Sequence, residues 1–94
     1  MEHYFDEEIA VKYGLESAVV YEYIKIRCAR NKHIINGRSW TRISLEKFKN
    51  VFPYFSEYTI ARAIDTLNDN FVIEIDNFNN SPMDRTRWYS ICGA

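Results

Sequence analysis

Apolar residues recur with helical spacing over the first third of the chain and predict two helices there. In residues 6–14, Asp6 is a suitable N-cap, acidic residues follow it, and Gly14 is a natural stop. A longer helix is expected from Glu16 to about Asn31, with apolar or aromatic residues on more than one stripe of its surface. So broad an apolar surface indicates either a central helix buried on several sides or a helix shared with a partner chain.

The middle of the chain predicts a short strand followed by a short helix. Residues 36–37 are Asn-Gly, a turn signal, and residues 38–43 alternate in polarity as a strand does. Residues 44–50 begin with a serine that suits an N-cap and continue as a helix, with Leu45 and Phe48 three positions apart on its buried side.

The clearest amphipathic pattern lies in the next helix, which we expect from Ser56 to about Asn68. An apolar connector, residues 51–55, precedes it and is broken by Pro53, and Asn70 is a plausible left-handed stop. Its apolar positions at i, i+3, i+4 and i+7 are Ile60, Ala63, Ile64 and Leu67.

Two further strands close the chain. Residues 71–76 alternate in polarity, residues 77–84 are a polar loop, and residues 86–91 form a second strand that can pair with the first as a hairpin. The predicted fold is a single α+β domain, mainly α, spanning residues 1–94. Its order of elements is that of a winged helix-turn-helix: two N-terminal helices, a helix-turn-helix pair and a C-terminal β-hairpin wing.

Length and composition exclude several classes of protein. The chain has 94 residues, 47% of them hydrophobic and 16% aromatic, so it can form a packed core and is not a disordered tail. No apolar run is long enough to cross a bilayer, and the N-terminus lacks the features of a secretory signal. We therefore expect a cytoplasmic protein without a membrane partner.

The nearly neutral total charge hides a strong segregation along the chain. Residues 1–24 carry six acidic side chains and one lysine, whereas residues 25–49 carry eight basic side chains and one glutamate. Residues 50–94 carry six acidic side chains and three arginines. A basic middle third can attract phosphates, although a solvated helix face has a similar composition.

The sequence contains no pattern typical of a catalytic or metal site. Cys28 and Cys92 are too few for a disulfide framework and are expected to be reduced thiols, and neither they nor His3 and His33 have metal-ligand spacing. We expect no catalytic residues, no metal, no cofactor and no enzymatic activity.

Within the predicted fold, the second helix of the pair can enter the major groove of DNA, and the hairpin loop can lie on the backbone. Arg62 is the residue best suited to a bidentate contact with guanine, the alternative being a solvated pairing with Asp65 or Asp69. Phosphate contacts are expected from three sets of side chains: Ser56, Tyr58 and Thr59 on that helix, Arg38, Arg42, Lys47 and Lys49 around the first helix of the pair, and Arg85 and Arg87 at the wing.

Two alternatives accompany these assignments. Asp84 can pair with Arg85 to make the hairpin rigid, and the aromatic residues of the strands can stack on bases but are expected to pack in the core. Those aromatic residues are Trp40, Trp88 and Tyr89. The acidic residues of the second helix of the pair are unfavourable for DNA. Winged helices are also used as protein-interaction modules, so a protein partner is the alternative.

Several segments together resemble a known family. They are Tyr13-Gly14-Leu15-Glu16-Ser17-Ala18-Val19-Val20, Asn36-Gly37-Arg38-Ser39-Trp40, Phe52-Pro53-Tyr54-Phe55-Ser56-Glu57-Tyr58-Thr59-Ile60-Ala61-Arg62-Ala63-Ile64 and Met83-Asp84-Arg85-Thr86-Arg87-Trp88-Tyr89. Across residues 6–92 the chain resembles the winged-helix N-terminal domain of replication initiator proteins, or replisome organizers, of phages and related mobile elements of Gram-positive bacteria.

The resemblance implies a double-stranded DNA partner of origin or operator type and no catalysis by this domain. It implies that Ser56, Thr59 and Arg62 lie on the recognition helix, with Asp84, Arg85 and Arg87 at the wing. Members of that family usually continue into segments that recruit replication machinery, so we expect a piece of such a protein or a small stand-alone phage protein. A stand-alone protein would be a regulator, or would bind and inhibit a host protein complex as an anti-CRISPR protein does. A homodimer is also expected, because specific DNA sites commonly have two-fold symmetry.

Overall fold

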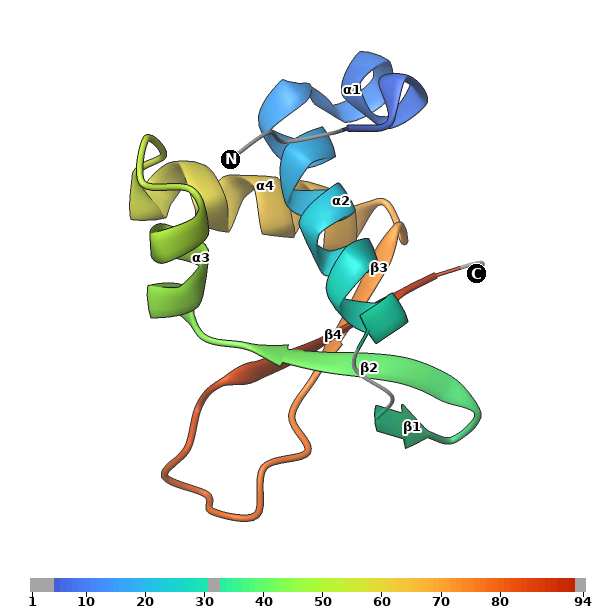
Figure 1. Ribbon diagram of the computed structural model, residues 1–94, viewed down its shortest axis with the longest axis vertical. Coiled ribbons are helices and arrows are strands. Elements are labelled where there is room, and N and C mark those ends of the chain that lie inside the picture. The colour runs from blue at the N-terminus through green and yellow to red at the C-terminus, as the bar shows by residue number, and fades with distance from the viewer. Residues whose placement is uncertain (1–4, 31–32, 93–94) are drawn as a thin grey trace.

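The structure is an α+β fold in which four helices lie on one side of a four-stranded antiparallel sheet, with α1 farthest from it (Figure 1). It is a computed structural model that describes residues 5–30 and 33–92. The elements are α1 (Glu7–Tyr13), α2 (Leu15–Arg30), β1 (His33–Ile35), β2 (Arg38–Ile43), α3 (Leu45–Val51), α4 (Glu57–Asp69), β3 (Ile73–Asp76) and β4 (Arg87–Ile91). The predicted α+β class is confirmed.

Helix α1 begins and ends at the residues that the sequence predicts. The Asp6 carboxylate accepts hydrogen bonds from the backbone N–H groups of Glu8 and Ile9, at 2.9 and 3.3 Å. Gly14 ends the helix with φ +95°, a conformation that glycine adopts without strain. The chain then enters α2 at Leu15, one residue earlier than predicted.

Helix α2 is the central helix of the fold. It packs against α1, α4, β2 and β4, and Figure 1 shows it running from α1 down to the sheet. Its buried side chains are Ser17, Ala18, Val19, Val20, Ile24 and Cys28. Other elements of the same chain therefore cover most of the apolar surface of α2, as expected for a central helix buried on several sides. The predicted helix end at Asn31 lies outside the described residues, as does His3.

The sheet contains one strand that the sequence analysis did not predict. Its order is β1-β2-β4-β3, and β1 pairs with β2 through the register His33↔Trp40. Asn36 and Gly37 connect the two strands with φ +53° and +78°, the pair of left-handed residues that a type I′ hairpin turn requires. The predicted hairpin of β3 and β4 is confirmed, with Ile75 opposite Tyr89.

Helices α3 and α4 both begin at capping serines. The Oγ atoms of Ser44 and Ser56 accept hydrogen bonds from the backbone N–H groups of Lys47 and Thr59, each at 3.0 Å. In α4 the predicted stripe of Ile60, Ala63, Ile64 and Leu67 is buried. In α3 Phe48 is fully buried, but the prediction that Leu45 faces the core is wrong, because its side chain is 46% exposed.

The end of α4 differs from the prediction. Asn70 keeps a negative φ of −98°, and Phe71 adopts the left-handed conformation with φ +58°. The N–H of Val72 then donates to the Leu67 carbonyl at 2.9 Å, which closes the helix end. Because these residues terminate α4, the strand begins at Ile73 and not at Phe71.

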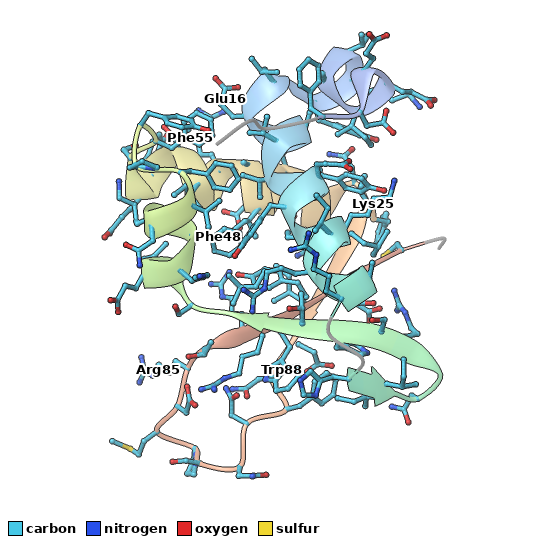
Figure 2. All side chains as sticks on the ribbon, in the orientation of Figure 1. Glu16, Lys25, Phe48, Phe55, Arg85 and Trp88 are labelled. Carbon is cyan, nitrogen blue, oxygen red and sulfur yellow. The ribbon has the colours of Figure 1, made fainter. Side chains whose placement is uncertain are left out.

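Aromatic rings occupy both faces of the sheet. On the helix side, Phe48 lies edge-to-face against Tyr23 and Tyr89, with ring centroids 5.8 and 5.6 Å apart. On the other side, Phe78 lies against Trp40 and Trp88 at 4.9 and 5.8 Å, and Figure 2 shows Trp88 on the side of the sheet away from the helices. Core packing is confirmed for Tyr89, whereas the buried Trp40 and the half-buried Trp88 pack with Phe78 outside the core cluster.

Candidate nucleic-acid interface

A groove of about 420 Å³ lies where α3, α4 and β4 meet. We call it the β4 groove and define it by Ile43, Ser44, Phe48, Ile64, Arg85 and Arg87, which are among its lining residues. The register Ile43↔Arg87 places the start of β4 next to the end of β2, from which α3 follows after one residue. The helix pair and the loop before β4 therefore form the walls of one concave surface.

Two exposed cations without an ion pair line this groove, and a third lies on α3. Arg85 and Arg87 belong to its lining, and Lys47 lies on α3, one turn after the Ser44 cap. Within the part of the chain that the structure describes, none of the three has a carboxylate within 4.0 Å. Figure 2 shows Arg85 projecting outward from the loop. These three cations are available to an anionic ligand.

Hydrogen bonds within the β3–β4 loop, residues 77–86, hold Arg85 in place. Asp84 accepts from the Thr86 N–H at 3.0 Å, and the Asn79 side-chain amide donates to the carbonyls of Asp84 and Thr86 at 3.1 and 2.6 Å. The indole N–H of Trp88 donates to Asn79 Oδ1 at 2.9 Å. The loop is thus connected to the sheet by side chains on both sides of Arg85.

The Asp84 carboxylate interacts with the backbone of this loop and with β2, and it does not pair with Arg85. It forms an ion pair with Arg42 across from β2, which excludes the predicted pairing with Arg85 in this structure. The pKa of Asp84 is lowered, first by the hydrogen bond from the Thr86 N–H, then by the Thr86 hydroxyl and by the charge of Arg42. Arg42 was predicted as a phosphate contact, and its charge is instead balanced by Asp84.

Lys49 and Arg38 also have partners within the chain. The Lys49 ammonium donates to the Phe55 carbonyl and so links α3 to the connector before α4. Arg38 does not lie around α3 as predicted, because it stands at the opposite end of β2. There it pairs with Glu74 and donates to the Ile91 carbonyl at 3.3 Å.

The outer face of α4 holds the remaining predicted contacts. Its exposed residues include Glu57, Tyr58, Arg62 and Asp65. The Arg62 guanidinium lies 5.9 Å from the centre of the Tyr58 ring, and neither Asp65 nor Asp69 pairs with it. The hydroxyl of Ser56 donates to Thr59 Oγ1 at 3.0 Å, so both predicted phosphate ligands at this helix start also serve the cap.

Asp65 was named from the sequence as a partner for Arg62 and as one of the acidic residues of α4, but it was not related to β4. Burial raises the pKa of Tyr89, the nearby Arg87 lowers it, and the charge of Asp65 raises it. Asp65 on α4 therefore acts on the same Tyr89 ring as Arg87 does, and it brings a negative charge toward the β4 groove. No signal within the sequence of α4 identifies this, since the contact joins α4 to β4.

The thiols and histidines of the described residues do not form a cation site. No group of three or more histidine, cysteine, aspartate or glutamate side chains gathers there in a way that could hold a metal. Cys28 and Cys92 are free thiols, and burial raises the pKa of Cys28. Among these residues no helix is both long and apolar enough to span a membrane.

Comparison of the chain with family models, curated proteins and solved structures finds no match. The resemblance to replication initiator domains therefore stays a prediction, resting on its motif residues. Of those, Gly14, Ser56 and Asp84 each have a defined local role in the structure: helix stop, helix cap and loop anchor.

Proposed function

We propose that this chain is a winged helix-turn-helix domain that binds double-stranded DNA, in replication initiation or transcriptional regulation of a phage or mobile element. In this assignment α3 and α4 are the helix-turn-helix pair, and the β3–β4 loop is the wing. The observation that carries the proposal is that two cations without an ion pair, Arg85 and Arg87, line the β4 groove, with a third, Lys47, on α3.

The chemistry of these cations suits a phosphate backbone. Arginine presents a planar fork of N–H donors that matches phosphate oxygens, and lysine adds a compact positive charge. Half or more of protein–DNA hydrogen bonds go to phosphate and sugar, and such contacts set the position of the protein on the duplex. A wing held by the Asp84 and Asn79 hydrogen bonds would present Arg85 with little loss of conformational entropy.

Base recognition falls to α4 in this proposal. Arg62 is the exposed basic residue of α4; it lies over the Tyr58 ring and lines a hollow that Glu16 also lines, and we propose that it contacts a guanine edge. Glu57, Asp65 and Asp69 surround it with negative charge. We therefore expect the wing and α3 to supply most of the affinity and Arg62 to supply a smaller share.

Charge reversal at the wing tests the proposal against a matched control. The double variant Arg85→Glu/Arg87→Glu is compared with Lys25→Glu/Arg30→Glu, which reverses two exposed, unpaired cations on α2. Binding is measured by fluorescence anisotropy with a random duplex too short for two domains, at two salt concentrations.

We expect the wing variant to lose at least about tenfold in affinity, or about 1.4 kcal/mol, and the α2 variant to keep it. The parent affinity should fall steeply with salt, because each phosphate contact releases counterions. Equal losses in both variants, or no binding of the parent at low salt, would contradict a DNA site at the wing.

A second candidate function is binding to a host protein complex and inhibiting it. The observation that favours it is the acidic outer side of α4, next to which Tyr54 and Tyr58 are 60% and 69% exposed. Tyrosine is enriched at protein interfaces, whereas carboxylates repel DNA. If the parent chain does not bind duplex DNA at low salt, the result would favour this second function.

A further inference from the structure

Strand β3 lies at an edge of the sheet, and one of its two sides is free. The order β1-β2-β4-β3 gives it a single neighbour, β4, and no other strand of the described residues pairs with it. The N–H of Cys92 donates to the Val72 carbonyl at 3.0 Å, and Ile73 stands opposite Ile91 at the next position. Because hydrogen-bonded and non-hydrogen-bonded pairs alternate in an antiparallel ladder, the N–H and C=O groups of Ile73 and Ile75 point away from β4. These backbone groups are open to a further strand.

A hollow of about 530 Å³ lies at the start of this free edge. Its lining includes Phe71, which follows α4, and Ile73 and Glu74 of β3. Phe71 is 83% exposed and has a left-handed backbone with φ +58°, which a bulky side chain adopts at an energetic cost. A glycine would end α4 at this position without that cost. The chain thus presents an aromatic ring to solvent beside the free edge, at a position where glycine would suit the fold better.

The free edge of β3 is negative on balance. Asp69 and Glu74 line the hollow, and Asp76 ends the strand. Among the described residues, only Glu74 of these three has an ion pair, which it forms with Arg38. Arg87 lies on the helix side of the sheet and Asp76 on the other side, because successive residues of a strand alternate between its faces. Three carboxylates therefore stand against one arginine.

The alternation of β3 determines which strand would complement it. Ile73 and Ile75 pack toward the core on the helix side, and Glu74 and Asp76 lie on the other side. Residues that stand opposite each other in a ladder have their side chains on the same face. An added strand therefore needs apolar side chains next to Ile73, Ile75 and Phe71, and basic side chains next to Glu74 and Asp76.

We propose that the free edge of β3 binds an extended segment of a partner protein in which basic residues alternate with apolar ones. Backbone hydrogen bonds to Ile73 and Ile75 supply the affinity, and the carboxylates and the hollow select the side chains. The β3 strand of a second copy does not fit, because it would bring carboxylates against Glu74 and Asp76, and like charges opposite each other are destabilising. The site uses neither the β4 groove nor Arg62, so it does not depend on the proposed DNA binding.

A synthetic peptide and amide hydrogen exchange test this site. The probe is a short capped peptide of alternating lysine and valine, and the control peptide has glutamate in place of each lysine. Exchange of the Ile73 and Ile75 amides is followed by NMR, because these two N–H groups gain a hydrogen bond only if a strand is added at the free edge. Titration of the same spectra gives the affinity.

Two variants separate the parts of the site. Asp69→Lys/Asp76→Lys reverses two exposed carboxylates at the edge, and Glu7→Lys/Glu46→Lys is the control on α1 and α3; none of the four has an ion pair among the described residues. Phe71→Gly removes the exposed ring and suits the left-handed backbone, so the midpoint of its urea denaturation should be no lower than that of the parent. Circular dichroism checks that each variant is folded.

We expect the lysine peptide to bind with a dissociation constant below about 1 mM and to slow exchange of both amides, and the glutamate peptide to do neither. Asp69→Lys/Asp76→Lys and Phe71→Gly should each bind about tenfold more weakly than the parent, and Glu7→Lys/Glu46→Lys should bind like the parent. The proposal is overturned if the lysine peptide does not bind at millimolar concentration, or if it binds without protecting Ile73 and Ile75. Equal losses in the two charge variants, parent affinity in Phe71→Gly, or parent oligomers that protect the same amides without peptide would also overturn it.

Discussion

The β4 groove and the outer face of α4 belong to the same pair of helices but carry opposite charges. Arg85 and Arg87 line the groove, and neither has an ion pair among the described residues. The outer face of α4 has one arginine, Arg62, among three carboxylates. For a polyanionic partner, the side of the β3–β4 loop is therefore the attractive surface, and the outer face of α4 is not.

Charge along the chain does not predict this difference. Residues 25–49 are the basic block of the sequence, yet Arg27, Arg38, Arg42 and Lys49 all bind groups within the chain. Residues 50–94 are acidic in total, yet they supply both arginines that line the groove. Free charge at a surface depends on which side chains find partners when the chain folds.

The largest effect is expected from Phe48→Ala, which removes a fully buried side chain that lines the β4 groove. Phe48 is fully buried against Tyr23 and Tyr89, and removal of a buried phenylalanine costs about 3–5 kcal/mol. Urea denaturation measures the loss. Leu45→Ala in the same helix is the control, and it should cost less than about 1 kcal/mol because Leu45 is half exposed. Equal costs would contradict the described packing of α3.

A comparison of Arg87→Ala with Arg62→Ala separates the two surfaces by their contribution to DNA affinity. Arg87→Ala should cost at least about 1.4 kcal/mol in a titration with duplex DNA, since a charged hydrogen bond is lost. Arg62→Ala should cost less than about 1 kcal/mol with a random duplex, where no cognate guanine is present. The reverse order would make α4 the main contact.

Removal of the carboxylate near the groove should raise DNA affinity. Asp65→Asn keeps the size of the side chain and removes a negative charge that acts on Tyr89 beside Arg87. A unit charge about 10 Å from a phosphate in water changes the energy by about 0.4 kcal/mol, so we expect about a twofold gain. Asp69→Asn at the end of α4 serves as the control with a smaller gain. An affinity that falls in Asp65→Asn would show that this carboxylate helps binding.

Acidification should loosen the wing locally, which is the smallest effect. The pKa of Asp84 is lowered in the folded chain, so its contribution is present above the ordinary aspartate pKa and is lost as pH falls through the folded value, below about pH 4. The NMR signal of the Trp88 indole N–H, which is bonded to Asn79, reports this change. Asp84→Asn should show the loosened signal at neutral pH, and an unchanged signal in that variant would contradict the anchoring role of Asp84.

Local signals predicted most of the helices and turns. The caps Asp6, Ser44 and Ser56 were identified because a short polar side chain next to an apolar pattern satisfies the free N–H groups of a helix start. The stripe in α4 was predicted from the spacing of its apolar residues, and the turn from the Asn36-Gly37 pair, which readily adopts the left-handed conformation. Both signals lie within a few neighbouring positions of the sequence.

Features that join distant segments were not predicted. Strand β1 has only three residues and exists because β2 pairs with it. The partner of Arg38 is 36 positions away and that of Arg42 is 42 positions away, so no spacing rule connects them. The exposure of Leu45 likewise depends on how α3 is oriented on the core, which its own seven residues do not determine.

The salt dependence of duplex binding tests the central claim most directly. Each phosphate contact contributes about 0.9 to the slope of log affinity against log salt concentration. The account predicts that Arg85→Ala/Arg87→Ala binds with a slope lower than that of the parent by about 1.8, and that Lys25→Ala/Arg30→Ala keeps the parent slope. A parent slope near zero, or an unchanged slope in the wing variant, would contradict a DNA contact at the β4 groove.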